Sequence, residues 1–273
     1  MKNITLYSNT KKTSLEAKDK LFRMLTAAGY KIVSEGADLI IVIGGDGTML
    51  SAIRRYRAMK IPFLGVNTGT LGFLPSVPPN QLEIILELLD TKAYAIQSYP
   101  LLEVRCKTVN GEQIDGYAFN EILIKHLEPR LLEVKIYIDG KPFNYFTGDG
   151  FIISTPIGST GYAIWAGGVA THSELPVYQI TPIHANDNSI NRPLKTSMVV
   201  PIETVIDFSI VKAQLRAVIV ACDGRKVTDD FISQISVRAA HKEVKILRYG
   251  DYDYFELFRN KIIDKRVSRV LSD

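Results

Sequence analysis

The first hundred residues alternate between short apolar runs and longer segments that carry one apolar face. The run Leu39–Ile43 is entirely aliphatic, which is typical of a strand buried on both faces. Apolar residues then recur at helical spacing at Met49, Ile53 and Tyr56. Strands that alternate with helices predict a parallel sheet covered by helices. The predicted strands are 3–7, 31–34, 39–43 and 61–66, and the predicted helices are 13–28, the segment after Thr48 and the segment after Pro79.

The first of these helices has a defined start and a defined buried side in the sequence. Thr13 or Ser14 is expected to cap it, and Gly29 is expected to stop it. Its buried side is predicted to consist of Leu15, Leu21, Phe22 and Leu25.

From about residue 99 the helical spacing largely disappears, and short runs rich in Val, Ile, Tyr and Phe replace it. Turn pairs such as Asn110-Gly111 and Asp139-Gly140 separate the runs, which is typical of a mostly antiparallel β domain. The last stretch, 252–270, has helical spacing again and is expected to pack on the first domain. We therefore expect an α/β N-terminal domain with a parallel sheet (1–98 plus 252–273) and a β-rich C-terminal domain (99–251). The strands predicted there are 101–109, 117–125, 133–138, 151–154, 198–201, 205–210, 217–221, 235–239 and 244–248.

Composition and charge narrow the class of protein. The 273 residues carry a formal net charge of +4, the basic residues are dispersed, and no nucleic-acid motif occurs. The two cysteines, Cys106 and Cys222, occur without a secretory signal and are expected to be reduced core residues. No apolar run approaches the length of a membrane span. A cytoplasmic enzyme or binding protein, with no nucleic-acid or membrane partner, is therefore expected.

The stretch Gly44-Gly45-Asp46-Gly47-Thr48 follows the aliphatic strand directly. Ligands of open α/β sheets bind at the carboxyl ends of strands, and glycines allow the backbone to approach a bulky anion. A carboxylate at this point would repel phosphate, so Asp46 suggests a second task, either accepting a proton or holding a hydroxyl group. These five residues alone leave an ordinary tight turn as the alternative.

Two further glycine-rich segments and one polar pair are candidates for binding. The segment Gly65-Val66-Asn67-Thr68-Gly69-Thr70-Leu71-Gly72-Phe73-Leu74 follows the next strand, so both loops are expected at one sheet edge. The segment 148–162 combines glycines, small hydroxyl residues and Tyr162, which suits a nucleotide, although a surface loop is the alternative. Asn120-Glu121 lies in an otherwise apolar predicted strand, where an uncompensated carboxylate is costly. We expect this pair to face a cleft, and the alternative is a glutamate at a sheet edge in water.

Several common signatures are absent from the sequence. No Gly-x-Gly-x-x-Gly follows a predicted strand, and there is no P-loop Lys-Ser/Thr signature. No cysteine or histidine cluster has the spacing of metal ligands, so we predict no metal-ligating residues.

The ordered set of motifs resembles that of bacterial NAD kinases (the ATP/polyphosphate-NAD kinase family). It comprises 44–48, 65–74, 120–121, 149–162 and the closing Asp251-Tyr252-Asp253-Tyr254-Phe255 before a helix. The resemblance extends over essentially the whole chain. The first motif alone is weak, because lipid kinases and phosphofructokinases carry similar ones, whereas the ordered set is specific.

The resemblance implies a reaction and a set of binding residues. Such enzymes transfer the γ-phosphoryl group of ATP to the 2′-hydroxyl of the adenosine ribose of NAD, need a divalent cation such as Mg²⁺, and are cytoplasmic homo-oligomers. A tetramer or dimer with sites shared between subunits is implied, with Asp149 coming from a neighbouring subunit and Asp46 acting as the base. The other implied binding residues are Gly44, Gly45, Gly47, Thr48, Phe73, Asn120, Glu121, Thr160, Gly161, Tyr162, Ala163, Trp165 and His184.

The sequence departs from the family pattern at five positions that bear on substrate preference. Trp165 stands where a small serine is usual, and an indole there would narrow the pocket or move the nicotinamide end. Thr147 stands where a basic residue is frequent, and Gly161 where alanine is usual. His184 and Asn186 stand where small or apolar residues are common.

Two other functions are consistent with part of the sequence. A lipid kinase of the diacylglycerol or sphingosine type shares the glycine-Asp turn and the two-domain plan. A catalytically silent dinucleotide-binding protein is the other alternative; Trp165 favours it, and Asp46 argues against it.

Overall fold

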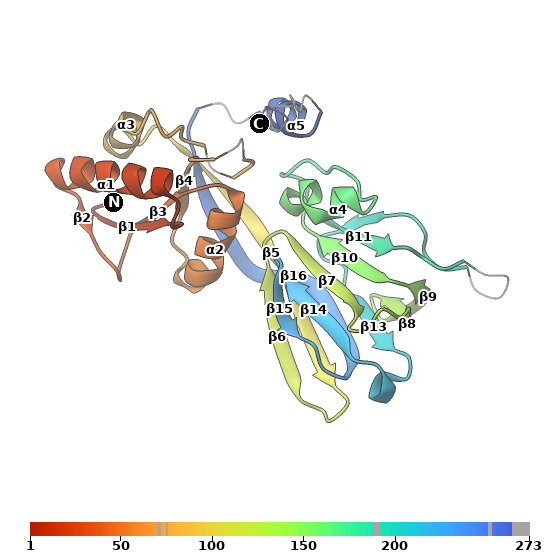
Figure 1. The fold of residues 1–273 in the computed structure, drawn as a ribbon. Helices are drawn as coiled ribbons and strands as arrows, with labels where there is room; N and C mark the ends of the chain where they lie inside the picture. Colours follow the sequence, from red (N-terminus) through yellow and green to blue (C-terminus); the bar gives the residue numbers. More distant parts are fainter. Residues whose placement is uncertain (70–71, 75, 188–191, 251–252, 264–273) are drawn as a thin grey trace, which may run out of the picture. The chain divides into compact units, whose positions relative to one another are not determined.

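The computed structural model describes residues 1–69, 72–74, 76–187, 192–250 and 253–263 (Figure 1). The chain divides into two compact units, the first comprising Met1–Tyr99 and Glu243–Asp273 and the second Pro100–Lys242. The second boundary was predicted after residue 251. In the structure it lies between Lys242 and Glu243, within the strand β16 (Ile232–Arg248), whose last residues belong to unit 1.

Unit 1 contains the predicted parallel sheet. Its strand order is β2-β1-β3-β4-β16, and β1, β3 and β4 pair in parallel, as do β4 and the end of β16. Every residue of β3 is buried, as expected for an aliphatic strand inside a parallel sheet. The elements are β1 (Asn3–Ser8), α1 (Lys12–Ala27), β2 (Lys31–Ile32), β3 (Leu39–Ile43), α2 (Asp46–Tyr56), η1 (Arg57–Met59), β4 (Phe63–Val66) and α3 (Glu83–Thr91).

The helix α1 differs from its prediction in two ways. It begins at Lys12, so Ser14 lies inside the helix instead of capping it, and the Ser14 hydroxyl lies 2.6 Å from the Thr68 hydroxyl. The buried stripe falls at Ser14, Ala17, Leu21 and Leu25, whereas Leu15 and Phe22 are exposed. The prediction was wrong for Leu15 and Phe22. The buried positions follow one another at spacings of three and four residues, and these two residues lie next to that stripe on the helix surface.

The last described segment packs on unit 1, as predicted. It consists of α5 (Tyr254–Phe258) and a π-helical turn, η4 (Arg259–Ile263). The Asp253 carboxylate caps α5 by accepting the backbone N–H groups of Phe255 and Glu256. Tyr254 is buried, and its ring centroid lies 6.3 Å from that of Phe73. Residues 264–270 of the predicted helix lie outside the described residues.

Unit 2 consists mostly of antiparallel strands in two sheets, so the predicted fold class is confirmed. One sheet has the order β12-β11-β10-β7-β14-β15; in the other, β16, β13, β8 and β9 follow one another, and β5 pairs with β16 and β6. The prediction omitted β9, β11 and β15, and it divided β16 into two strands. The elements are β5 (Ala95–Thr108), β6 (Gln113–Ala118), β7 (Glu121–His126), β8 (Leu132–Ile138), β9 (Lys141–Gly148), β10 (Gly150–Ser154), η2 (Ile157–Thr160), α4 (Tyr162–Trp165), β11 (Val177–Ile183), β12 (Met198–Pro201), β13 (Ile206–Ile210), η3 (Ala213–Leu215), β14 (Val218–Cys222) and β15 (Arg225–Thr228).

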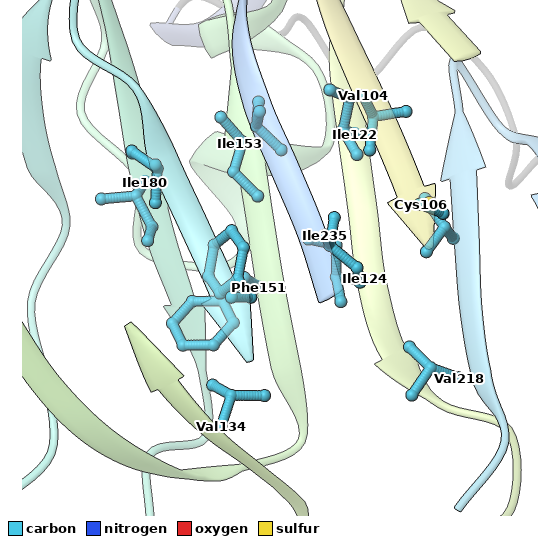
Figure 2. Close-up of a cluster of buried hydrophobic side chains, with 14 of the residues drawn as sticks. Val104, Cys106, Ile122, Ile124, Val134, Phe151, Ile153, Ile180, Val218 and Ile235 are labelled. Carbon is cyan, nitrogen blue, oxygen red and sulfur yellow. The ribbon is translucent and has the colours of Figure 1, made fainter. Parts of the chain in front are cut away.

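The core of unit 2 is formed by apolar side chains from both sheets (Figure 2). The Phe151 ring of β10 lies 4.1 Å from that of Phe146 and 5.2 Å from that of Phe208, measured between ring centroids. Both cysteines are buried, as predicted, and burial raises the pKa of the Cys106 thiol to about 12. Among the residues that the structure describes, no helix has the length and apolar character required to cross a membrane.

Candidate active site

Asp46 is the first residue of α2 and follows the end of β3. The turn before it tolerates only glycine at position 44, because a Cβ there would lie 2.2 Å from the Thr48 hydroxyl oxygen. The Gly44 N–H donates to the Val66 carbonyl at 2.9 Å, which joins this turn to the end of β4. Gly45 occupies the N-cap position, and Gly47 lies in the first turn of the helix. The two glycine-rich segments thus leave adjacent parallel strands at one edge of the unit 1 sheet.

Backbone donors and an ammonium group hold the Asp46 carboxylate. Its Oδ1 accepts the Leu74 N–H at 3.0 Å, and its Oδ2 accepts the Phe73 N–H at 3.2 Å. Its Oδ2 also forms an ion pair with the Lys261 ammonium. A carboxylate fixed in this way, and about a quarter exposed, is placed to accept a proton from a bound hydroxyl group.

A buried arginine supports the loop segment that binds Asp46. The Arg248 side chain is 2 % exposed, and its Nη1 donates to the carbonyls of Phe73 at 3.1 Å and Leu74 at 2.8 Å. Its Nε donates to the Gln97 amide oxygen at 3.0 Å, and its Nη2 to the Tyr99 hydroxyl at 2.9 Å. The backbone at 73–74 is therefore held from both sides, by Asp46 through its N–H groups and by Arg248 through its carbonyls. The Phe73 side chain itself is buried.

In unit 2, the Asn120-Glu121 pair is placed by a carboxylate that sequence reasoning missed. The Asp223 carboxylate accepts the backbone N–H groups of Phe119 at 2.9 Å, Asn120 at 2.7 Å and Glu121 at 3.2 Å. The Asp223 N–H in turn donates to the Glu121 carbonyl at 3.0 Å. The strand predicted for 117–125 is therefore wrong at its centre, where β6 ends at Ala118 and β7 begins at Glu121.

The sequence does contain a signal for this arrangement. Asp223-Gly224 connects β14 to β15, with φ values of +48° and +70°. An Asp-Gly pair with two positive φ values is the preferred two-residue hairpin turn. The pair therefore predicts a hairpin with Asp223 in its turn. In that position the Asp223 carboxylate can accept N–H groups of a neighbouring strand.

Glycines allow the loop after β10 to pack closely on this pair. A Cβ at Gly158 would lie 2.1 Å from the Asn120 carbonyl oxygen, and one at Gly161 would lie 3.2 Å from the Glu121 Oε2 atom. The Thr155 hydroxyl donates to the Phe119 carbonyl at 2.7 Å. Gly161, which stands where alanine is usual in the family pattern, thus lies directly beside the Glu121 carboxyl group.

Glu121 is a buried carboxyl group with an unusual protonation equilibrium. Burial, and secondly repulsion by Asp223, raise its pKa from 4.5 to about 7, although the Tyr162 backbone N–H acts in the opposite direction. Its Oε2 atom is buried and makes no hydrogen bond within the described part of the chain. Near neutral pH the group can therefore either donate a hydrogen bond or accept one, which suits a ligand hydroxyl group.

Replacing Glu121 by glutamine is expected to change how stability depends on pH. Because the folded state binds the proton of Glu121 more tightly, the contribution of Glu121 to wild-type stability falls as pH rises from about 4.5 to about 7. The free energy of unfolding of Glu121→Gln relative to wild type should therefore increase by up to roughly 3 kcal/mol between pH 4.5 and pH 8. Urea unfolding at both pH values measures the difference. Glu16→Gln on the surface of α1 is the control, and a pH-independent difference for Glu121→Gln would contradict the prediction.

The residues after Gly161 present two exposed aromatic side chains. Tyr162 is 48 % and Trp165 71 % exposed, whereas Ala163 between them is buried. The Thr160 hydroxyl donates to the Ile157 carbonyl at 3.4 Å. The structure thus brings Asn120, Glu121 and the segment 160–165 together where β10 ends (α4 in Figure 1).

Asp149 and His184 lie at the other end of β10. The Asp149 Oδ2 atom lies 2.9 Å from the His184 Nδ1 atom, and the Asp149 N–H donates to the Ile183 carbonyl at 2.9 Å. Ser154, at the far end of β10, is the residue that pairs with Glu121. The rise of a strand, about 3.3 Å per residue, puts roughly 17 Å between Asp149 and Ser154. Within one chain, the structure therefore does not bring Asp149 and His184 to Glu121.

Comparison with known protein families covers most of the chain. Residues 1–94 match the model of the ATP-NAD kinase N-terminal domain, and residues 119–249 match that of the ATP-NAD kinase C-terminal domain. A protein of Clostridium beijerinckii named NAD kinase is 34% identical over 231 residues, which are 83% of this chain and 78% of the relative. One of Lactobacillus johnsonii, also named NAD kinase, is 32% identical over 263 residues, which are 96% of each chain.

Solved structures agree with this match. An NAD kinase from Archaeoglobus fulgidus in complex with ATP is similar with a TM-score of 0.70 and 25% identity, over 95% of this chain and 96% of that chain. Yeast NADH kinase complexed with NADH has the same fold, with a TM-score of 0.84 and 21% identity over 100% of this chain and 90% of that chain. From the two domain models and the relatives along its length, the chain belongs to the ATP-NAD kinase family.

Proposed function

We propose that this chain transfers the γ-phosphoryl group of ATP to the 2′-hydroxyl of the adenosine ribose of NAD, with Asp46 as the general base. The observation that carries the role of Asp46 is its position: a carboxylate in a glycine turn at the end of β3, held by two backbone N–H groups and one ammonium group. Family membership supports the reaction itself.

The proposed mechanism relies on positioning and charge. Phosphoryl transfer requires little covalent chemistry from the protein, so placing the reactants and stabilising charge supply most of the rate. Asp46 takes the proton from the 2′-hydroxyl as that oxygen bonds to the γ-phosphorus, and the bond from the γ-phosphorus to the bridging oxygen of ADP breaks. A positioned base contributes about 10²–10⁴-fold to such a step.

In this proposal the unit 2 residues bind the dinucleotide. Glu121, with a pKa of about 7 and a buried Oε2 atom, is suited to bind a ribose hydroxyl group. The exposed rings of Tyr162 and Trp165 offer flat apolar faces for a base. The Asn120 side chain and the Thr160 hydroxyl add further polar groups.

Mg²⁺ is proposed to arrive with the triphosphate. It is usually bound by one or two carboxylates, water and substrate phosphates, not by a cage of protein ligands. Asp46 offers one carboxylate at the glycine turn, which fits this mode. When bound, the cation would neutralise charge on the phosphates.

An end-point assay tests the reaction. Purified protein is incubated with ATP, Mg²⁺ and NAD, and an NADP-specific dehydrogenase measures the NADP formed. NADP formation is expected; parallel reactions with NADH and with polyphosphate determine the acceptor and donor preferences. If NAD bound in calorimetry but no NADP formed, a silent dinucleotide-binding protein would be indicated. If neither occurred, lipid substrates would be tested next, although the matches to NAD kinases do not favour either alternative.

We further propose a homo-oligomer, a dimer or a tetramer, in which Asp149 and His184 serve the site of a neighbouring subunit. Their separation of roughly 17 Å from the Glu121 end of β10 supports this arrangement. Light scattering would determine the oligomeric state, and a monomer would contradict the proposal. The cytoplasmic location stays a prediction from the sequence.

A further inference from the structure

Lys261 brings a positive charge to Asp46 from a distant part of the chain. It lies in η4, 215 residues after Asp46, and its ammonium forms an ion pair with the Asp46 Oδ2 atom. The same nitrogen lies 4.5 Å from the centroid of the Phe73 ring. The two charged side chains are 29 % (Lys261) and 27 % (Asp46) exposed, so the pair is partly shielded from water and yet open on one side.

The segment that carries Lys261 is anchored in unit 1. The Tyr254 side chain is buried, with its ring centroid 6.3 Å from that of Phe73 and 6.1 Å from that of Phe258. Asp253 caps the start of α5 with two hydrogen bonds. The ammonium is therefore placed at Asp46 by packed aromatic rings, and the Phe73 ring offers it a favourable cation–π contact.

Lys261 supplies positive charge that the two glycine-rich segments lack. The segments 44–48 and 65–74 contain no lysine or arginine, and their only charged residue is Asp46, which repels a triphosphate. The nearby Arg248 guanidinium is 2 % exposed and donates to the carbonyls of the same loop. Lys261 supplies a cation that is both at Asp46 and partly exposed.

We propose that Lys261 binds the γ-phosphoryl group of ATP during its transfer. The inference rests on the proposed function: the hydroxyl that Asp46 deprotonates attacks the γ-phosphorus, so a group in contact with Asp46 is also close to the γ-phosphate oxygens. An ammonium group has three donors and can contact the carboxylate and a phosphate oxygen together. It also stabilises the negative charge on the phosphoryl group in the transition state.

The test compares Lys261→Met, which removes the charge but keeps an unbranched side chain, with Lys261→Arg, which keeps the charge. Calorimetry with Mg²⁺ measures the Kd of ATP and that of ADP, which lacks only the γ-phosphoryl group. We expect Lys261→Met to weaken ATP binding at least tenfold, to leave ADP binding within about twofold and to lower kcat about 100-fold. Lys261→Arg should recover part of each loss. Lys12→Met, on the exposed surface of α1, is the matched control.

A second comparison separates direct contact from mere neutralisation of Asp46. In an Asp46→Asn background there is no carboxylate to neutralise, so Lys261→Met should still weaken ATP binding if the ammonium contacts phosphate. Unchanged ATP binding in that background would overturn the proposal, and so would equal losses for ATP and ADP, which would indicate a structural role. Thermal unfolding establishes that the variants fold. A wild type that forms no NADP would refute the reaction itself, whereas a wild type that forms NADP beside a Lys261→Met variant with normal ATP binding would refute only the role of Lys261.

Discussion

Replacing Asp46 by asparagine is expected to lower kcat about 10²–10⁴-fold while the protein still folds, because the variant lacks the carboxylate that is proposed to act as the general base. The new amide has nearly the same shape as the carboxylate. Its oxygen can continue to accept the Phe73 N–H, while its NH₂ group faces the Leu74 N–H and cannot accept it. The loss of one such bond costs about 1 kcal/mol of stability.

The measurement is kcat at saturating ATP and NAD, together with thermal unfolding of the same samples. Asp90→Asn is the control, since the Asp90 carboxylate accepts the Tyr30 hydroxyl at the surface of unit 1, outside the glycine turns. Near-normal turnover in Asp46→Asn would rule out Asp46 as the base. A variant that failed to unfold cooperatively would show that the carboxylate is needed for the fold as well.

Replacing Asp223 by alanine is expected to lower the free energy of unfolding by roughly 3–5 kcal/mol, because three backbone N–H groups lose their acceptor. The same change should raise the KM for NAD, since the Asn120-Glu121 backbone would no longer be fixed. It should also lower the pKa of Glu121, because a repelling charge is removed, although burial still acts in the opposite direction.

The chain contains a closely matched control for this change. Asp139 also precedes a glycine in a hairpin turn and also has a positive φ, +49°, but its carboxylate accepts only the Val205 N–H, at 2.8 Å, among the hydrogen bonds of the described residues. Asp139→Ala should therefore cost about 1 kcal/mol and leave the KM for NAD unchanged. Urea unfolding and steady-state kinetics give both quantities. Equal losses of stability in the two variants, or an unchanged KM for NAD in Asp223→Ala, would contradict the role assigned to Asp223.

The parts of the fold that could be predicted from the sequence are those determined by local pattern. The aliphatic run of β3 ends at a glycine turn, and the strand was predicted with its exact bounds. The change from helical spacing to short β runs near residue 99 likewise predicted an α/β N-terminal domain and a β-rich C-terminal domain. The continuity of strands was less predictable. β6 and β7 are separated at Phe119-Asn120, where the Asp223 carboxylate, from a hairpin about 100 residues later, accepts the backbone N–H groups.

The residues that support the candidate site could not be predicted in the same way. Lys261 lies 215 residues from Asp46, and Arg248 lies 175 residues from Phe73. Nothing in the periodicity around either residue distinguishes it from other basic residues of the chain. Only the three-dimensional arrangement shows that one lies at the Asp46 carboxylate and the other beneath the loop that binds it.

The distance between Asp46 and Lys261 along the chain has a consequence for the order of synthesis. A nascent chain that has grown as far as Tyr249 already contains both segments that match the ATP-NAD kinase models, 1–94 and 119–249. It contains the complete glycine turns and the Asn120-Glu121 pair, but it still lacks the ammonium group that neutralises Asp46. If Lys261 acts as proposed, the last step of translation completes the phosphoryl-transfer centre. A prematurely terminated product would keep the unit 2 residues that are proposed to bind the dinucleotide but would lack an effective phosphoryl-transfer centre.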